Sequence, residues 1–420
     1  MNRFWQHVKS GDWLTLERVR GYSLILLILA GLAMAGWIML SKGGVDPNGK
    51  PLGTDFLSFY AAGSLVLDGR TAEVYDMAAH YARQQKIFGA AIPYYGWLYP
   101  PIFLLIATPL ALLPYAAALA LWQIATLLAF LGLIGWIVRP IRIAHPEFRH
   151  TWLWVALAFP AVFINLGHGQ NGFLTAALLG AALMTLPMRP VLAGVLFGLL
   201  AYKPQFALVI PVALLAAGQW RAIVSATVTV LVLVGSTAWL FGIEVWFAFA
   251  RSTAVSRKLL LEQGDVGFEK LQSVFAAIRL WGGSIPLAYT LQTAISILTV
   301  CGVVWVWRSR LEVSQKAAVL VIATLLASPH VLDYDLTLLA PALAFIAVTG
   351  LRRGFRPYEV SMMAVAWAVP LFSRGIAGLT GIPLGLMAVT ALYVVTLRRA
   401  AHDMHEMERR PVRYSALTPV

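Results

Sequence analysis

Residues 54–70 read TDFLSFYAAGSLVLDGR and form the first polar segment after the first long apolar run of the chain. Large apolar and small residues recur in this segment at helical spacing, namely Phe56, Phe59, Tyr60, Gly63 and Leu67. The periodicity predicts an amphipathic helix that lies on a membrane surface. Asp55 stands at the head of this helix, so the pattern predicts a carboxylate that projects beside the membrane.

The composition of the whole chain points to a membrane. Of the 420 residues, 60% are hydrophobic and only 12% are charged, and the mean hydropathy is +0.75. A soluble core cannot bury so large an apolar fraction. The single cysteine, Cys301, lies in an apolar run, which excludes an intramolecular disulfide and suggests no thiolate metal site. We therefore predict an all-α polytopic membrane protein.

Apolar runs of spanning or near-spanning length follow one another along the chain. They cover about 22–40, 99–138, 151–166, 172–187, 190–202, 204–217, 221–241, 286–307, 314–328, 334–350, 358–373 and 379–397. Several are shorter than the roughly 20 residues of a perpendicular span, as expected where Pro and Gly break helices that are buried in protein. We predict about 11 to 13 transmembrane helices in one domain, 22–400, between cytoplasmic ends at 1–21 and 401–420.

Two long polar segments, 41–98 and 242–285, interrupt the apolar runs and are predicted to be external loops. The first contains the helix at 54–70 and a second predicted helix near 74–88. The second contains a sequence at 245–261 in which aromatic and basic residues are mixed, a composition typical of an interfacial helix.

Residues 99–138 allow two interpretations. In the first, the Pro-rich part 99–114 forms a re-entrant or half helix and the remainder crosses once, which places the basic loop 139–150 in the cytoplasm. In the second, two full crossings occur and that loop lies outside. We favour the first because of the distribution of charge.

The loop charges orient the chain. Segments that the first interpretation places in the cytoplasm hold 20 of the 32 Lys and Arg residues and 8 of the 19 acids. The opposite side keeps 12 basic and 11 acidic residues. This asymmetry follows the positive-inside rule and accounts for the basic composition without nucleic acid.

Polar residues concentrate near the predicted outer ends of the helices. They are Asp55, Tyr99-Pro100-Pro101, the turn 167–172, Tyr202-Lys203-Pro204-Gln205 and the segment 328–335. Polar groups near bilayer depth are costly unless they are paired or face a cavity. Because all five fall on the same side, we predict that they form one hydrated site.

These motifs, taken in order, resemble glycosyltransferase family 87. The resemblance rests on Asp55-Phe56 followed by Tyr60 and Ala62-Gly63, on Val74-Tyr75-Asp76, on Tyr99-Pro100-Pro101 with 110–114, on a Gly-Gln-Asn turn at 169–171, and on Tyr202-Lys203-Pro204. It spans nearly the whole chain and is strongest between 54 and 222. The family contains polytopic transferases of the GT-C class, including polyprenyl-phosphomannose-dependent mannosyltransferases, so the resemblance implies a GT-C-type helical bundle.

The resemblance implies a hexosyltransferase, most simply a mannosyltransferase, that takes a sugar from a polyprenyl-phosphate donor in the outer leaflet. A glycolipid or glycan is then the acceptor, and transfer proceeds with inversion. Asp55 matches the family's catalytic base, which removes the acceptor proton while the sugar–phosphate bond opens. Because Asp55 follows Thr54, the alternative is a simple helix cap. The resemblance also implies a multi-pass protein of the bacterial plasma membrane with an outward-facing site, and it calls for no cofactor.

Cations at the outer boundary are expected to meet the donor phosphate. Lys203 is the only Lys or Arg between Arg189 and Arg221, and Pro204 after it marks a helix boundary. The alternative is that Lys203 snorkels to lipid headgroups. His330 precedes a predicted helix and is a second candidate for the phosphate, with a plain helix-entry histidine as the alternative.

Four further residues are candidates for binding sugar hydroxyls: His168, Gln170, Asn171 and Tyr99. The first three lie in a Gly-rich turn that is also an ordinary connection between spans. For Tyr99, whose ring could stack on a sugar, we favour an interfacial aromatic belt. Asp333 and Asp335 form an Asp-x-Asp sequence, but acidic residues are expected at a helix start, so we predict no metal. Two other functions remain open, a flippase or transporter of lipid-linked glycans and a structural membrane subunit.

Overall fold

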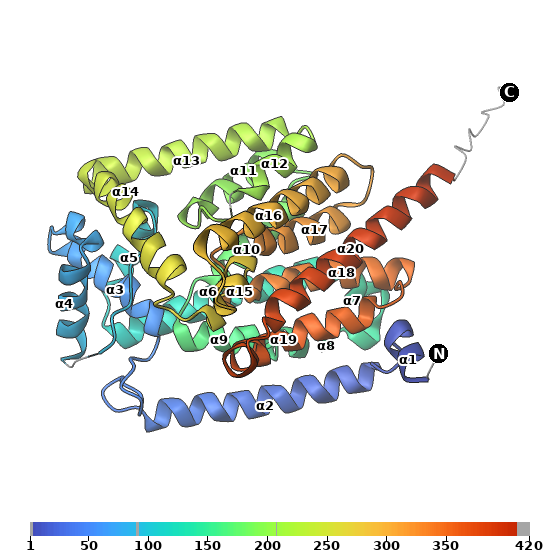
Figure 1. The fold of residues 1–420 in the computed structure, drawn as a ribbon, viewed down its shortest axis with the longest axis horizontal. Helices are drawn as coiled ribbons and strands as arrows, with labels where there is room; N and C mark the ends of the chain where they lie inside the picture. The colour runs from blue at the N-terminus through green and yellow to red at the C-terminus, as the bar shows by residue number, and fades with distance from the viewer. Residues whose placement is uncertain (1–2, 90–91, 207, 410–420) are drawn as a thin grey trace.

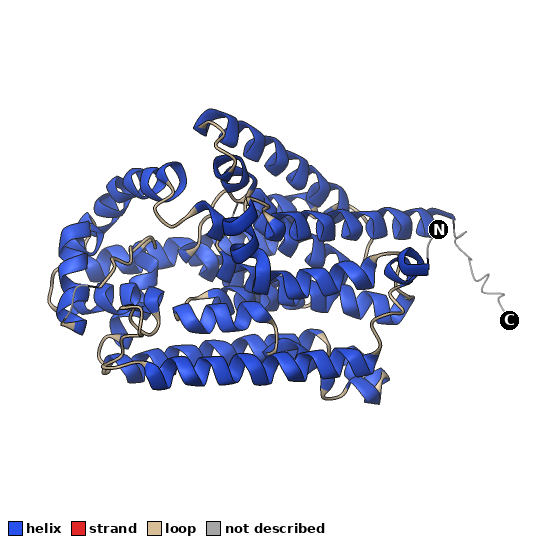
Figure 2. Ribbon diagram, turned by 60° about the horizontal axis from the view of Figure 1, so that its bottom comes forward, coloured by secondary structure: helices blue, strands red, loops and turns tan. Residues whose placement is uncertain are grey.

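The computed structural model describes residues 3–89, 92–206 and 208–409. These residues form helices joined by short connections, and the only extended pairings among them are three isolated β-bridges. The view in Figure 2 shows helices throughout. The prediction of an all-α fold is therefore confirmed.

Twenty α-helices and seven short 3-10 or π segments make up the described chain. The α-helices are α1 Arg3–Ser10, α2 Leu16–Leu40, α3 Thr54–Leu67, α4 Met77–Phe88, α5 Leu104–Leu110, α6 Tyr115–Ile137, α7 Arg139–Ala144, α8 Thr151–Leu157, α9 Pro160–His168, α10 Gly172–Thr185, α11 Pro190–Leu199, α12 Val209–Ala216, α13 Trp220–Phe241, α14 Glu244–Arg257, α15 Val274–Leu280, α16 Ile285–Trp307, α17 Val313–Ala327, α18 Leu339–Arg353, α19 Glu359–Thr380 and α20 Leu384–Arg409. The short segments are η1 Thr71–Tyr75, η2 Pro101–Phe103, η3 Pro146–Phe148, η4 Leu200–Tyr202, η5 Lys258–Gln263, η6 Phe268–Lys270 and η7 Asp333–Leu338.

Seven helices of the described chain are long and apolar enough to span a membrane, or up to eight if α8 and α9, which meet at a 42° bend, are counted as one broken span. The seven are α2, α6, α13, α16, η7 with α18, α19 and α20. Five further apolar helices have only 10 to 17 residues. The chain is therefore a polytopic membrane protein, and the predicted count of about 11 to 13 crossings depends on these shorter helices.

The long helices run along the same axis, which places the predicted loops at two opposite ends (Figure 1). Helices α3, α4 and α14, from the two predicted external segments, gather at the left of the figure. Helices α1 and α7 and the last turns of α20 lie at the right. Ion pairs join three of the basic segments at that end, with Arg353 close to Glu312 and Arg356 3.0 Å from Asp403. The structure thus separates the segments as the charge pattern predicted.

Residues 99–138 contain one helix of spanning length. The Pro-rich part forms η2 and the seven-residue helix α5, and α6 then runs the length of the bundle. Helix α5 packs closely against α3, since a Cβ added to Gly63 would lie 2.1 Å from the carbonyl oxygen of Ala107. The structure therefore favours the first of the two interpretations of this region.

Helix α3 differs from the prediction of an interfacial helix. Nine of its 14 residues are buried, and both Phe56 and Leu65 are fully enclosed. Helices α4, α5 and α9 cover it, so protein rather than membrane surface receives its apolar side chains. The periodic pattern identified the helix correctly, but the prediction that this helix lies on the membrane surface was wrong.

Two helix ends also differ from the predictions. The α-helix predicted at 245–261 ends at Arg257, and the residues that follow it form the π segment η5. Helix α20 continues to Arg409, beyond the end of the predicted apolar run at residue 397. Its last turns project from the bundle in Figure 1.

Candidate active site

The five polar segments singled out in the sequence come together at the end of the bundle where α3 and α4 lie. Hydrogen bonds or ion pairs link Asp55 to Gln170, Tyr99 to Gln170, Thr175 to Tyr202, and Lys203 to Asp335. The folded chain therefore brings these segments close to one another.

Asp55 lies in the first turn of α3, where backbone geometry exposes it. Gly53, just before the helix, adopts φ 71°, and a Cβ there would lie 2.8 Å from Leu119. This tight turn needs glycine and brings the chain into α3 with Thr54 buried and the Asp55 side chain 25% exposed. Asp55 Oδ2 accepts a hydrogen bond of 3.0 Å from Gln170 Nε2. One carboxylate oxygen is thus held by protein, and the side chain still reaches solvent.

Gln170 is fixed in one orientation. Its Oε1 accepts two hydrogen bonds, one of 3.0 Å from the Tyr99 hydroxyl and one of 2.8 Å from the Asn171 backbone N–H. An amide oxygen that accepts two donors leaves its nitrogen as the donor, so the amide must donate to Asp55. Gln170 is only 4% exposed, so its amide is held inside the protein, whereas the carboxylate that it contacts is partly open to solvent.

The turn 169–172 fixes the backbone of Gln170. Gly169 adopts φ 64°, and a Cβ on it would lie 2.7 Å from Phe56. Asn165 brackets the turn, since its Nδ2 donates to the Gln170 carbonyl at 3.0 Å and its Oδ1 accepts from the Gly172 N–H at 2.9 Å. The Gly-rich turn is therefore a rigid support for the residues around Asp55.

His168, at the end of α9, is the member of the turn that reaches solvent. Its Nδ1 lies 2.7 Å from Thr54 Oγ1 and 4.0 Å from Asp55 Oδ1, and its side chain is 30% exposed. Its ring meets that of Tyr334 edge to face, with the centroids 5.9 Å apart. His168 and Asp55 thus form one partly open polar surface.

The other predicted sugar-binding residues are buried. Asn171 is fully enclosed, and its side-chain oxygen and nitrogen have no hydrogen-bond partner in the described structure. Tyr99 is 9% exposed and lies in an aromatic cluster with Phe59 and Phe103, at centroid distances of 5.3 and 4.7 Å. Burial raises its pKa well above the usual range, and the negative charge of Asp55 adds to this. Tyr99 therefore belongs to the protein interior rather than to an aromatic belt.

Lys203 forms an ion pair that the sequence analysis did not predict. Its ammonium group lies 2.6 Å from Asp335 Oδ1, and both side chains are 2% exposed. The ring of Tyr334 lies 5.6 Å from the same nitrogen. Lys203 does not snorkel to headgroups, because its charge is neutralised inside the protein. One signal was available, since a cation isolated between apolar helices needs a counter-charge and Asp335 is one of few acids at that level.

Asp333 and Asp335 have different surroundings. Asp335 Oδ2 accepts the Leu332 N–H at 3.0 Å while Oδ1 meets Lys203, so both of its oxygens are used. Asp333 Oδ1 accepts the Tyr334 N–H at 2.9 Å. In the part of the chain that the structure describes, no group of three or more metal-binding side chains gathers. The Asp-x-Asp sequence thus forms the start of η7.

His330 lies in the loop between α17 and η7. Its backbone N–H donates to Ser328 Oγ at 3.2 Å. Burial lowers the pKa of His330, and the nearby charge of Lys203 lowers it further while Asp335 opposes the change. The imidazole is therefore neutral at pH 7 and offers one N–H donor next to the Lys203–Asp335 pair.

The sequence analysis also missed two cations near this site, Lys270 in η6 and Arg374 in α19. Lys270 is half-buried and Arg374 is exposed. The charges of Arg374 and Asp333 both act on Lys270. Their separation in sequence, about a hundred residues, gave no local signal that would connect them.

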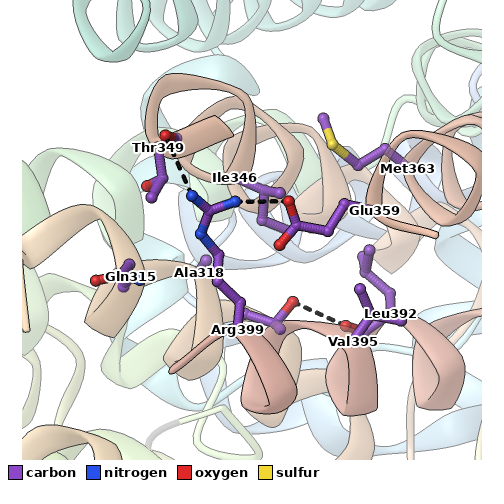
Figure 3. A pocket seen from close by; sticks show the side chains of 10 residues that line it. Gln315, Ala318, Ile346, Thr349, Glu359, Met363, Leu392, Val395 and Arg399 are labelled. Atoms are coloured by element: carbon purple, nitrogen blue, oxygen red, sulfur yellow. Dashed lines mark hydrogen bonds and ion pairs between the residues drawn. The ribbon is translucent and has the colours of Figure 1, made fainter. Parts of the chain in front are cut away.

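A cavity at the opposite end of the bundle is not part of this site. It lies among α17, α18, α19 and α20, and Figure 3 shows Arg399 pointing into it toward Glu359 and Thr349. Arg399 Nη1 lies 2.5 Å from Glu359 Oε2, and both side chains are almost fully buried. This ion pair ties α19 to α20 and closes the cavity between them.

Comparison with known proteins gives the family. Residues 97–329, more than half of the chain, match the sequence profile of glycosyltransferase family 87. A polyprenol-phosphate-mannose-dependent alpha-(1-2)-phosphatidylinositol pentamannoside mannosyltransferase of Mycolicibacterium smegmatis is 29% identical over 228 residues, which are 53% of this chain and 50% of that protein. The chain thus aligns with about half the length of this relative.

No solved structure matches the chain. The profile match includes Tyr99, the turn 167–172, Lys203 and the beginning of the segment 328–335, whereas Asp55 and Asp335 lie outside it. It confirms the resemblance inferred from the sequence motifs, and the chain is a member of glycosyltransferase family 87.

Proposed function

We propose that the protein transfers a hexose, most simply mannose, from a polyprenyl-phosphate sugar to a hydroxyl group of a glycolipid or glycan. The observation that carries this proposal is the partly exposed Asp55 carboxylate, held by Gln170 at the point where the five polar segments meet. Membership of the family and the printed activity of the mycobacterial relative support the choice of a lipid-linked donor and a glycolipid acceptor.

In the proposed mechanism Asp55 is the general base. Its Oδ2 is engaged by Gln170, so Oδ1, on the side of His168, is the oxygen that receives the proton of the acceptor hydroxyl. The acceptor oxygen attacks the anomeric carbon from the face opposite the phosphate, and the bond from that carbon to the phosphate oxygen breaks. A single displacement of this kind inverts the anomeric configuration.

His168 is proposed to contact a sugar hydroxyl, because its ring is partly exposed and lies 4.0 Å from Asp55. The same role was predicted for Gln170, Asn171 and Tyr99. All three are buried, which is better suited to holding Asp55 in position than to contacting a sugar. Their proposed contribution to substrate binding is therefore indirect.

His330 is proposed to donate a hydrogen bond to the donor phosphate, as its neutral imidazole carries one N–H. Lys203 was predicted to meet the phosphate directly. Its pairing with Asp335 supports a different role, in which the ion pair holds the loop that carries His330.

We propose that the active site faces outward from a bacterial plasma membrane. The gathering of the basic segments at the other end of the bundle supports this orientation, because positively charged loops remain on the cytoplasmic side. The lipid bilayer then supplies both the donor and a glycolipid acceptor laterally.

Incubation of the purified protein in lipid with a panel of radiolabelled polyprenyl-phosphate sugars and extracted membrane glycolipids tests the proposal. We expect labelled glycolipid from polyprenyl-phosphate mannose and none from nucleotide sugars. Transfer from a different lipid-linked hexose would correct the sugar but keep the reaction. Transport of a lipid-linked glycan without any transfer would refute the proposal in favour of a flippase.

A further inference from the structure

The proposed reaction changes the charge on the donor phosphate. A polyprenyl-phosphate sugar is a phosphodiester with one negative charge, and the polyprenyl phosphate left behind is a monoester with about −1.5 to −2 charges at pH 7. Groups that stabilise this added charge in the transition state accelerate the transfer. Lys203, neutralised by Asp335, does not supply it, so cations elsewhere in the site are needed.

Lys270 and Arg374 are two cations that the fold brings near the polar site. Lys270 ends η6 and Arg374 lies in the outer half of α19. The ion pairs found among residues 3–89, 92–206 and 208–409 include neither side chain. Lys270 is half-buried and Arg374 is exposed, so an anion from the membrane surface has access to them.

Gln272 connects the two elements that carry these cations. Its Nε2 donates to the Lys270 carbonyl at 3.2 Å. Its side chain reaches the gap between α19 and α20, since a Cβ added to Gly385 would lie 1.9 Å from Gln272 Oε1 and 3.2 Å from Ser373 Cβ. Ser373, the neighbour of Arg374, is fully buried and its hydroxyl has no partner in the described structure. Segment η6 is therefore packed against the part of α19 that carries Arg374.

The residues directly after η6 are paired with the loop that carries His330. The Gln272 N–H donates to the Val331 carbonyl at 2.7 Å, and Leu271 and Leu332 form an isolated antiparallel bridge. His330 and Asp333 flank this bridge on one side, and Lys270 lies next to it on the other. Lys270 is thus fixed relative to the polar site by backbone hydrogen bonds.

Charged groups of both signs surround Lys270. Two other cations, Lys50 and Arg374, and two carboxylates, Glu269 and Asp333, act on Lys270. Burial lowers the pKa of Lys270 and the charge of Arg374 lowers it further, and a bound anion would offset both effects. Lys270 and Arg374 thus lie in one group of interacting charges that also includes Asp333.

We propose that Lys270 and Arg374, together with His330, bind the phosphate of the lipid-linked donor. This inference rests on the proposed function. During transfer the electron pair of the bond between the anomeric carbon and the phosphate oxygen passes to the phosphate, and the acceptor proton passes to Asp55. Lys270 and Arg374 then face the monoester, whose charge has increased, and they bind it more tightly than the diester.

The test measures binding of a short-chain isoprenyl monophosphate to the purified full-length protein in phosphatidylcholine nanodiscs by isothermal titration calorimetry. The variants are Lys270→Gln, Arg374→Gln and the double variant. Matched controls are Lys258→Gln and Arg251→Gln, because both residues are exposed cations of the external segment 242–285 that also carries Lys270. Each single substitution removes one charged hydrogen bond to the phosphate, so it should weaken binding about tenfold and the double about a hundredfold. The controls should change it by less than about twofold.

Two results would overturn the inference. If wild type binds the monophosphate and the double variant binds it equally well, the phosphate site lies elsewhere and the proposed function still stands. If the double variant instead loses phosphatidylglycerol in a lipid-retention assay while monophosphate binding is unchanged, the two cations hold bilayer headgroups. A wild type that binds no isoprenyl monophosphate would contradict the proposed function itself.

Discussion

Removing the amide of Gln170 should impair catalysis without impairing donor binding. In a Gln170→Met variant the side chain keeps its length and apolar stem but no longer donates to Asp55 Oδ2, a bond of 3.0 Å in the wild type. Hydrogen bonds to charged groups contribute about 1.5–3 kcal/mol. Because the Asp55 side chain is 25% exposed, the lower end applies, and a loss of about 1.5 kcal/mol corresponds to about a tenfold fall in kcat.

The assay is steady-state transfer with the donor and acceptor concentrations varied in turn. We expect kcat to fall about tenfold and the donor KM to change less than about twofold, because Gln170 is buried behind the carboxylate. Tyr99→Phe should cause a smaller fall, since it only frees the Gln170 amide. The control is Gln123→Met, a nearby glutamine that donates to the Leu166 carbonyl rather than to Asp55. A Gln170→Met enzyme with unchanged kcat and a raised donor KM would refute the argument and return Gln170 to direct sugar binding.

Three further predictions concern the stability of the fold. Lys203→Met should destabilise by about 3–5 kcal/mol, because it leaves a buried carboxylate unpaired, and adding Asp335→Asn should restore most of the loss of thermal stability. Gly63→Ala should cost about 3 kcal/mol, since its Cβ would meet a backbone oxygen at 2.1 Å, whereas Gly36→Ala in α2, with open space around it, should be neutral in the same melting assay. Burial lowers the pKa of His80 to about 4, so the unfolded state binds its proton first as the pH falls. Up to about 3 kcal/mol should then be lost between about pH 6.5 and pH 4, and thermal midpoints for wild type and His80→Gln should converge at low pH.

The sequence predicted the helices well because apolar runs and charge breaks report directly on them. The runs at 221–241 and 286–307 correspond to α13 and α16 within a residue of each end. The position of a helix relative to the membrane was harder to predict. Helix α3 shows helical spacing whether its apolar side chains meet lipid or protein, and only the packing of α4 and α5 decides that they meet protein.

The sequence predicted which residues belong to the site better than it predicted the contacts between them. Asp55 and the turn 167–172 were identified because polar groups are rare among apolar runs. The bond from Gln170 to Asp55 joins residues 115 positions apart and the Lys203–Asp335 pair joins residues 132 positions apart, so neither leaves a local pattern. Lys270 and Arg374 were missed for the same reason, since the bridge of Leu271 to Leu332 that fixes Lys270 appears only in the folded chain.

The central claim is that Asp55 is the base of a lipid-linked sugar transfer. The most direct measurement compares Asp55→Asn with wild type in the radiolabelled transfer assay, at equal amounts of folded protein. Asp76→Asn is the matched control, because Asp76 is an exposed carboxylate of the same external segment that caps α4 and asparagine caps equally well. We expect transfer to be lost in Asp55→Asn and retained in Asp76→Asn. Full transfer activity in a folded Asp55→Asn protein would contradict the account.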